Sequence, residues 1–83
     1  MREAEMKYVR TFQDEVIMFP PTIIHSSFAH RKIKSAGFCV VEEDKVRCYG
    51  ESISLGLKSD KEDNFLATLA VYGSEKALKL EGE

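Results

Sequence analysis

The sequence contains no tryptophan and only two prolines, two cysteines and two histidines in 83 residues. Two cysteines are too few for the disulfide framework of small secreted domains, and no Cys-x-x-Cys pair opens a zinc site. No apolar run reaches the roughly 20 residues of a transmembrane helix, and the N-terminus has no apolar core of signal-peptide length. These absences predict a cytoplasmic protein without a metal or another cofactor.

Neither sign of charge dominates the chain. Twelve Lys and Arg residues stand against 14 Asp and Glu residues, for a net charge of −2, which argues against binding to nucleic acid through a basic face. The apolar fraction of 43% predicts a folded protein. Its 83 residues make a single domain, near the lower size limit for a domain without disulfides or metals. We expect residues 1–5 to form a flexible lead and residues 6–73 the domain. The tail at 74–83 fits a helical turn, a strand or disorder.

Two hairpins are predicted. Residues 7–12 and 15–19 carry β-branched and aromatic residues and flank turn formers at Gln13 and Asp14. Residues 33–42 and 45–55 form a second pair around a loop centred between Glu43 and Asp44. That centre predicts the cross-strand pairs Val41–Val46, Cys39–Cys48 and Phe38–Tyr49.

Each hairpin is followed by a predicted helix. Pro20 and Pro21 end the first hairpin, and Thr22 can cap a helix over 23–31. Ser59 and Glu62 have the spacing of a capping box, and the helix they open runs to about Tyr72 before Gly73. The chain therefore predicts an α+β fold in ββαββα order, with a four-stranded antiparallel sheet from two hairpins and two helices packed on one face.

The strand at 36–41 is apolar without a break, and so is the run at 16–19. Strands of this kind need cover on both faces. A chain this short has little left to cover a second face, so the sequence predicts a homodimer or another protein partner.

The second helix offers a surface for such a partner. Its broad apolar stripe is expected to face the sheet and consists of Phe65, Leu66, Leu69, Ala70 and Tyr72. The opposite side carries Asn64, Ala67, Thr68 and Val71. These four residues form either a tolerant solvated surface or a close-packing patch for a second subunit.

The candidate ligand residues are His25, His30, Arg31 and Lys58. They suit an anionic ligand such as a nucleotide, although a solvated helix end is the commoner explanation for the first three. The two histidines are five positions apart, which places them on different sides of a helix and argues against zinc. Both cysteines lie inside strands, where they are expected to be buried thiols; a disulfide between them is the alternative. No catalytic arrangement is visible.

Residues 35–38, 50–59 and 62–63, with the sequences SAGF, GESISLGLKS and ED, resemble a pattern in small bacteriophage and prophage proteins of unassigned activity. The resemblance covers about residues 6–73 and implies an accessory protein that acts by binding. The leading hypothesis is a non-enzymatic, homodimeric interaction protein that presents a binding surface. A binder of a small anionic ligand is the alternative, followed by a nucleic-acid binder that stacks bases on Phe38 and Tyr49.

Overall fold

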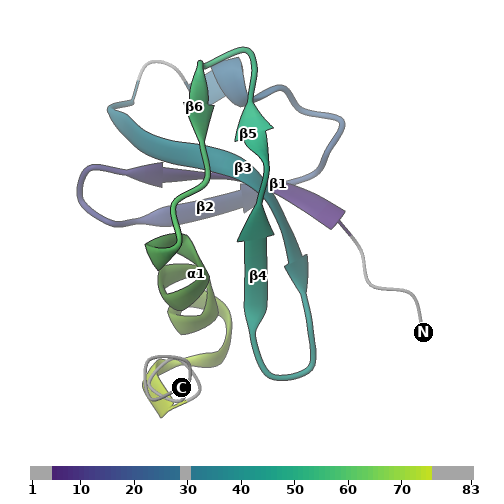
Figure 1. Ribbon diagram of the computed structural model, residues 1–83, viewed down its shortest axis with the longest axis vertical. Helices are drawn as coiled ribbons and strands as arrows, with labels where there is room; N and C mark the ends of the chain where they lie inside the picture. The colour runs from purple at the N-terminus through teal and green to yellow at the C-terminus, as the bar shows by residue number, and fades with distance from the viewer. Residues whose placement is uncertain (1–4, 29–30, 76–83) are drawn as a thin grey trace.

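The computed structural model describes residues 5–28 and 31–75. Its main element is a four-stranded antiparallel sheet in the order β2-β1-β3-β4 (Figure 1). The strands are β1 (Glu5–Thr11), β2 (Val16–Phe19), β3 (Ile33–Val41) and β4 (Val46–Tyr49). The α+β class and the four-stranded sheet built from two hairpins are confirmed, and pairing of β1 with β3 joins the hairpins.

The register of the second hairpin is also confirmed. Val41 pairs with Val46, and Cys39 pairs with Cys48. The N–H of Glu42 donates to the carbonyl of Lys45 at 2.8 Å and closes the loop. The position of the loop centre was sufficient to predict this register, because it determines which residues of the two strands lie opposite each other.

The predicted helix over 23–31 is wrong. The segment forms only η1, a short 3₁₀ turn at His25–Phe28; residues 29 and 30 lie outside the described residues. Ile23, Ile24 and the serines that follow have low helix propensity, and His25 Nε2 lies 2.8 Å from the Gly37 carbonyl oxygen, which ties the segment to β3. The ββαββα order and the pair of helices on one face are therefore wrong.

The predicted long strand over 45–55 is interrupted. Gly50 adopts a left-handed conformation with φ of 77° and ends β4, after which the chain forms a separate two-stranded sheet. This small sheet pairs β5 (Glu51–Ser52) with β6 (Leu57–Lys58) and crosses the main sheet above β3 (Figure 1).

One helix, α1 (Glu62–Tyr72), follows. The Asp60 carboxylate accepts a hydrogen bond from the Glu62 N–H at 3.1 Å, and the Asp63 carboxylate accepts one from the Asp60 N–H at 2.9 Å. The bond from the Asp60 N–H to Asp63 is one half of a capping box, displaced by one residue from the predicted Ser59–Glu62 pair; the Asp60 side chain accepts from Glu62 rather than from Asp63. Gly73 ends the helix as predicted, with φ of 92° and an N–H that donates to the Leu69 carbonyl. Within 5–28 and 31–75, no helix is long and apolar enough to cross a membrane.

Both faces of the sheet are covered by the chain itself. The face under α1, here called the helix face, holds the buried cluster of Tyr8, Cys39, Val46 and Ala67. The opposite face, here called the hairpin face, lies under η1 and β6 and holds Val9, Phe19 and Ala36. The apolar run of β3 is consequently buried or half-buried throughout. Its two-sided character needs no second subunit, which removes the first reason for predicting one.

The predicted orientation of α1 is wrong as well. Ala67 and Thr68 are fully buried against the sheet, whereas Leu69 is 39% exposed and Ala70 is exposed. The small Ala67 side chain lets the helix approach closely, and Thr68 bonds to the backbone of β4. Of the four proposed interface residues, only Val71 lies on the surface, at 43% exposure.

Candidate functional site

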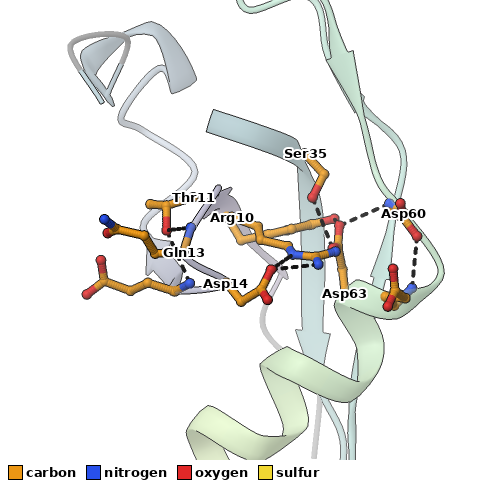
Figure 2. A network of polar contacts seen from close by, with 10 residues as sticks. Arg10, Thr11, Gln13, Asp14, Ser35, Asp60 and Asp63 are labelled. Atoms are coloured by element: carbon orange, nitrogen blue, oxygen red, sulfur yellow. Dashed lines mark hydrogen bonds and ion pairs between the residues drawn. The ribbon is translucent and has the colours of Figure 1, made fainter. Parts of the chain in front are cut away.

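A buried polar network lies beneath the N-terminal turn of α1 (Figure 2). The Asp63 side chain, fully buried, accepts hydrogen bonds from Arg10 Nη1 and Ser35 Oγ, both at 3.0 Å. It also accepts from the Tyr8 hydroxyl and from the Asp60 N–H. Its charge is thus balanced by the Arg10 guanidinium, and its lone pairs are occupied. A buried carboxylate is tolerated under these conditions.

Arg10 connects this network to the surface. Its side chain is 3% exposed and donates from Nε and Nη2 to Oδ1 of Asp14, at 3.1 and 2.7 Å. Burial opposes the charged form of Arg10, but hydrogen bonds with the two aspartates outweigh this effect and raise its pKa. The hydrogen bond from Arg10 lowers the pKa of Asp14 below its ordinary value of 3.8.

The β1–β2 turn holds Asp14 in place. Asp14 has φ of 65°, a left-handed conformation that is uncommon outside glycine but accessible to Asp and Asn. Its N–H donates to the Thr11 carbonyl at 2.9 Å, and Thr11 Oγ1 accepts from the N–H groups of Gln13 and Glu15, both at 3.2 Å (Figure 2). The turn therefore fixes the Asp14 carboxylate over Arg10.

A cavity of about 440 Å³ opens beside Arg10 and Asp14. It lies between the β1–β2 turn and the first turns of α1, and its volume is in the range of small-ligand sites. The rest of its lining is Lys61, Glu62, Asn64, Phe65 and Leu66. This site was not predicted from the sequence. The available signal was the alternation of β1, which places Arg10 on the same face of the strand as Met6 and Tyr8.

The outer edge of β4 is closed by side chains of α1. The Val46 N–H donates to Thr68 Oγ1 at 2.9 Å, and the Cys48 N–H donates to Asn64 Oδ1 at 2.7 Å. These are the N–H groups that point away from β3, because Val41–Val46 and Cys39–Cys48 are non-hydrogen-bonded pairs of the ladder. A strand from another molecule finds no free donor on β4 at these positions.

The outer edge of β2 is different. The Thr11 N–H donates to the Glu15 carbonyl, so alternation places Val9–Ile17 among the hydrogen-bonded pairs and turns the N–H and C=O groups of Val16 and Met18 outward. Within residues 5–28 and 31–75, no hydrogen bond reaches these outward groups. The strand is Val-Ile-Met-Phe, without a polar or charged side chain.

The predicted ligand residues are not gathered into one site. His25 is buried, and its ring packs edge-on against Phe19 and Phe38 while Nε2 contacts the Gly37 carbonyl. Arg31 is exposed and lies 3.6 Å from Glu15, and Lys58 is exposed in β6. His30 lies outside the described residues.

The cysteines are free thiols in the core of the helix face. Burial raises the pKa of Cys39 to about 11 and that of Cys48 to about 12, which keeps both protonated and poorly nucleophilic at neutral pH. In the described part of the chain, no group of three His, Cys, Asp or Glu side chains could hold a metal ion.

The stacked pair proposed for nucleic-acid binding is partly covered by neighbouring side chains. The rings of Phe38 and Tyr49 lie 6.2 Å apart at 26°. The Tyr49 hydroxyl bonds to the Glu5 carboxylate, and Arg47 covers the Tyr49 ring at 5.6 Å. Both rings are half-buried, so neither presents an open platform for a base.

Comparisons of the chain with protein-family models, with curated proteins and with solved structures found no match. The resemblance to bacteriophage and prophage proteins therefore stays a prediction from the sequence.

Proposed function

We propose that the protein is a non-enzymatic interaction protein that forms a homodimer by pairing the β2 edges of two copies. The observation that carries this proposal is the different treatment of the two sheet edges. Thr68 and Asn64 bind the outward N–H groups of β4, whereas those of Val16 and Met18 in β2 have no partner among the described residues. An open, uncharged edge strand is a template for another strand.

A second copy of β2 suits this edge. In an antiparallel pair about a two-fold axis at Ile17, Val16 of one copy faces Met18 of the other, and each pair exchanges both N–H···O bonds. The two Ile17 side chains then face each other in a non-hydrogen-bonded pair, where cross-strand apolar contacts are closest. The strand contains no charge that such pairing would bury. The result is a continuous eight-stranded sheet.

A binding role, rather than catalysis, agrees with the state of the polar groups. In the described part of the chain, every buried side-chain nitrogen or oxygen has a hydrogen-bond partner. The thiols, the only strong nucleophiles in the core, are protonated because of their raised pKa. A cytoplasmic location, where these thiols stay reduced, belongs to the same proposal.

Size-exclusion chromatography with light scattering tests the proposal through the backbone of Met18. We expect the wild type to be a dimer at micromolar concentration. Met18→Pro removes an N–H that points away from β1, which an edge strand tolerates, and is expected to give a folded monomer. Met18→Ala keeps the N–H and serves as the matched control, which is expected to dimerise. A monomeric wild type, or a folded Met18→Pro variant that still dimerises, would contradict the proposal.

A further inference from the structure

The cavity beside Arg10 and Asp14 combines an apolar floor with charged walls. Phe65 and Leu66 supply the apolar surface, and both are half-buried in the described chain. Its volume of about 440 Å³ accommodates a small ligand or one large side chain. The cavity lies on the helix face at the β1–β2 turn and does not involve the outward backbone groups of β2.

The charged groups around this cavity are of both signs and balance one another. Arg10 and Lys61 are cations, whereas Asp14 and Glu62 are carboxylates on the cavity wall. Asp63 is a third carboxylate, bonded to Arg10 from behind at 3.0 Å. On the cavity wall two cations stand against two carboxylates, and Lys34, whose charge also acts on Asp14, offsets Asp63. The sign of charge that the cavity prefers is therefore decided by the side-chain atoms that a ligand can reach.

Asp14 has an oxygen available to such a cation. Both hydrogen bonds from Arg10 end on Oδ1, and no hydrogen bond from a described residue reaches Oδ2. The Asp14 side chain is 54% exposed, and its lowered pKa keeps it ionised at neutral pH. Asp63, Arg10 and Asp14 form a series of alternating charge, and Oδ2 of Asp14 at its exposed end can accept a hydrogen bond from a cation.

An anion would fit this cavity poorly. To reach Arg10 it would have to displace Asp14 and break two charge-assisted hydrogen bonds of 3.1 and 2.7 Å. The hydrogen bonds of Thr11 hold the turn that carries Asp14, which opposes the displacement. Glu62 on the same wall would repel the anion.

We infer that this cavity binds an organic cation with an apolar body, namely a guanidinium or primary ammonium group attached to a hydrocarbon chain. The cationic head donates to Oδ2 of Asp14, and the hydrocarbon lies against Phe65 and Leu66. The Phe65 ring adds attraction for the cation through its face. This chemistry occurs both in free alkylguanidines and alkylamines and in an arginine or lysine side chain of a protein.

The test is a titration of the ¹⁵N-labelled protein with n-butylguanidinium, followed by amide chemical shifts. The neutral n-butylurea has nearly the same shape and serves as the matched ligand. We expect saturable shifts at the β1–β2 turn and the first turns of α1 with the cation, and none with the urea. Equal binding of the two ligands would overturn the inference, because charge would then play no part.

Asp14→Asn tests the carboxylate itself, since Asn accepts the left-handed conformation of residue 14. We expect the variant to bind n-butylguanidinium about tenfold more weakly, the loss expected for one charge-assisted hydrogen bond. Asp44→Asn removes the same charge from the exposed β3–β4 loop and is expected to leave binding unchanged. An equal loss in both variants, or no loss in Asp14→Asn, would overturn the inference. So would shifts of the same amides by acetate that grow stronger in Asp14→Asn, because they would identify an anion site.

A peptide arm distinguishes the two sources of the cation. Acetyl-Gly-Arg-Gly-amide carries the same guanidinium in a backbone context. If it binds at least about tenfold more tightly than n-butylguanidinium, an arginine of a protein partner is the supported source. If it binds equally or more weakly, a free small cation is supported. If none of these ligands binds, this inference is overturned. The proposed homodimer is unaffected by that result, because light scattering tests it separately through the molecular mass in solution.

Discussion

Nη1 of Arg10 donates a hydrogen bond of 3.0 Å to Oδ1 of Asp63, and both side chains are almost completely removed from water. This contact joins the centre of the sheet to the N-terminal turn of α1. Because Asp63 also accepts the Asp60 N–H, one carboxylate both caps the helix and neutralises the guanidinium.

Removing the charge of Asp63 is expected to destabilise the fold strongly. Asp63→Asn leaves the buried Arg10 guanidinium without its inner counter-ion, so the free energy of unfolding should fall by about 3 kcal/mol in urea denaturation. Asp14→Asn, which removes the exposed partner of the same arginine, should cost clearly less. Equal costs for the two variants would show that burial does not govern this ion pair.

A methyl group at Gly37 is expected to be poorly tolerated. A Cβ at this position would lie 2.5 Å from the backbone carbonyl oxygen of Tyr49, which cannot move without separating β3 from β4. Gly37→Ala should lower the free energy of unfolding by about 2 kcal/mol or more. In Gly56→Ala the new Cβ meets no atom within 4 Å, so only the left-handed φ of +68° should lower the free energy of unfolding, by about 1 kcal/mol. A smaller cost at Gly37 than at Gly56 would contradict the close approach of these strands.

The closure of the β4 edge depends on the hydroxyl of Thr68. Thr68→Val keeps the shape of the side chain but leaves the Val46 N–H without an acceptor, which should cost about 1–3 kcal/mol in urea denaturation. Thr68→Ser keeps the hydroxyl and should lose less. We also expect Thr68→Val to associate more readily at high concentration, since it opens a second edge. A Thr68→Val protein as stable as wild type would argue against this role of the hydroxyl.

The buried thiols predict a loss of stability in alkaline solution. Burial raises the pKa of Cys39 from 9.0 to about 11 and that of Cys48 to about 12. Above pH 9 the unfolded chain releases thiol protons that the folded chain retains, so the free energy of unfolding falls as the pH rises from 9 to about 11. Below pH 9 both states keep these protons, and the thiols contribute no pH dependence.

Tyr8 acts in the same direction, because burial and its hydrogen bond to Asp63 raise its pKa above 10.0. A Cys39→Ala, Cys48→Ala double variant should therefore show a shallower alkaline decline than the wild type, without becoming flat. Urea denaturation at a series of pH values measures both slopes. Identical slopes in the two proteins would mean that the thiols do not ionise differently on unfolding.

The parts of the fold that were predicted correctly depend on local patterns. The charged loop centred between Glu43 and Asp44 located the second hairpin, and Gly73 located the end of α1. The predicted orientation of α1 is wrong because polar helix residues were expected to face solvent. Asn64 and Thr68 instead face the sheet, since an edge strand needs acceptors for its outward N–H groups.

The buried charges were missed for a related reason. A sequence pattern does not show which distant residue will neutralise a charge, and Arg10 and Asp63 are separated by 53 positions. Only the alternation of β1 placed Arg10 beside Tyr8 on the inner face. Cover for the second face of β3 was also non-local, because it comes from η1 and the β5–β6 pair, neither of which was predicted.

Amide hydrogen exchange resolved by residue is the most direct test of the proposed dimer. We expect exchange at Val16 and Met18 to slow as the protein concentration rises from micromolar to millimolar, because these N–H groups exchange from the monomer and the monomeric fraction of the dimer falls. Exchange at Cys48, whose N–H is already held by Asn64, should not depend on concentration. Rates at Val16 and Met18 that stay constant over the whole range would contradict pairing through β2.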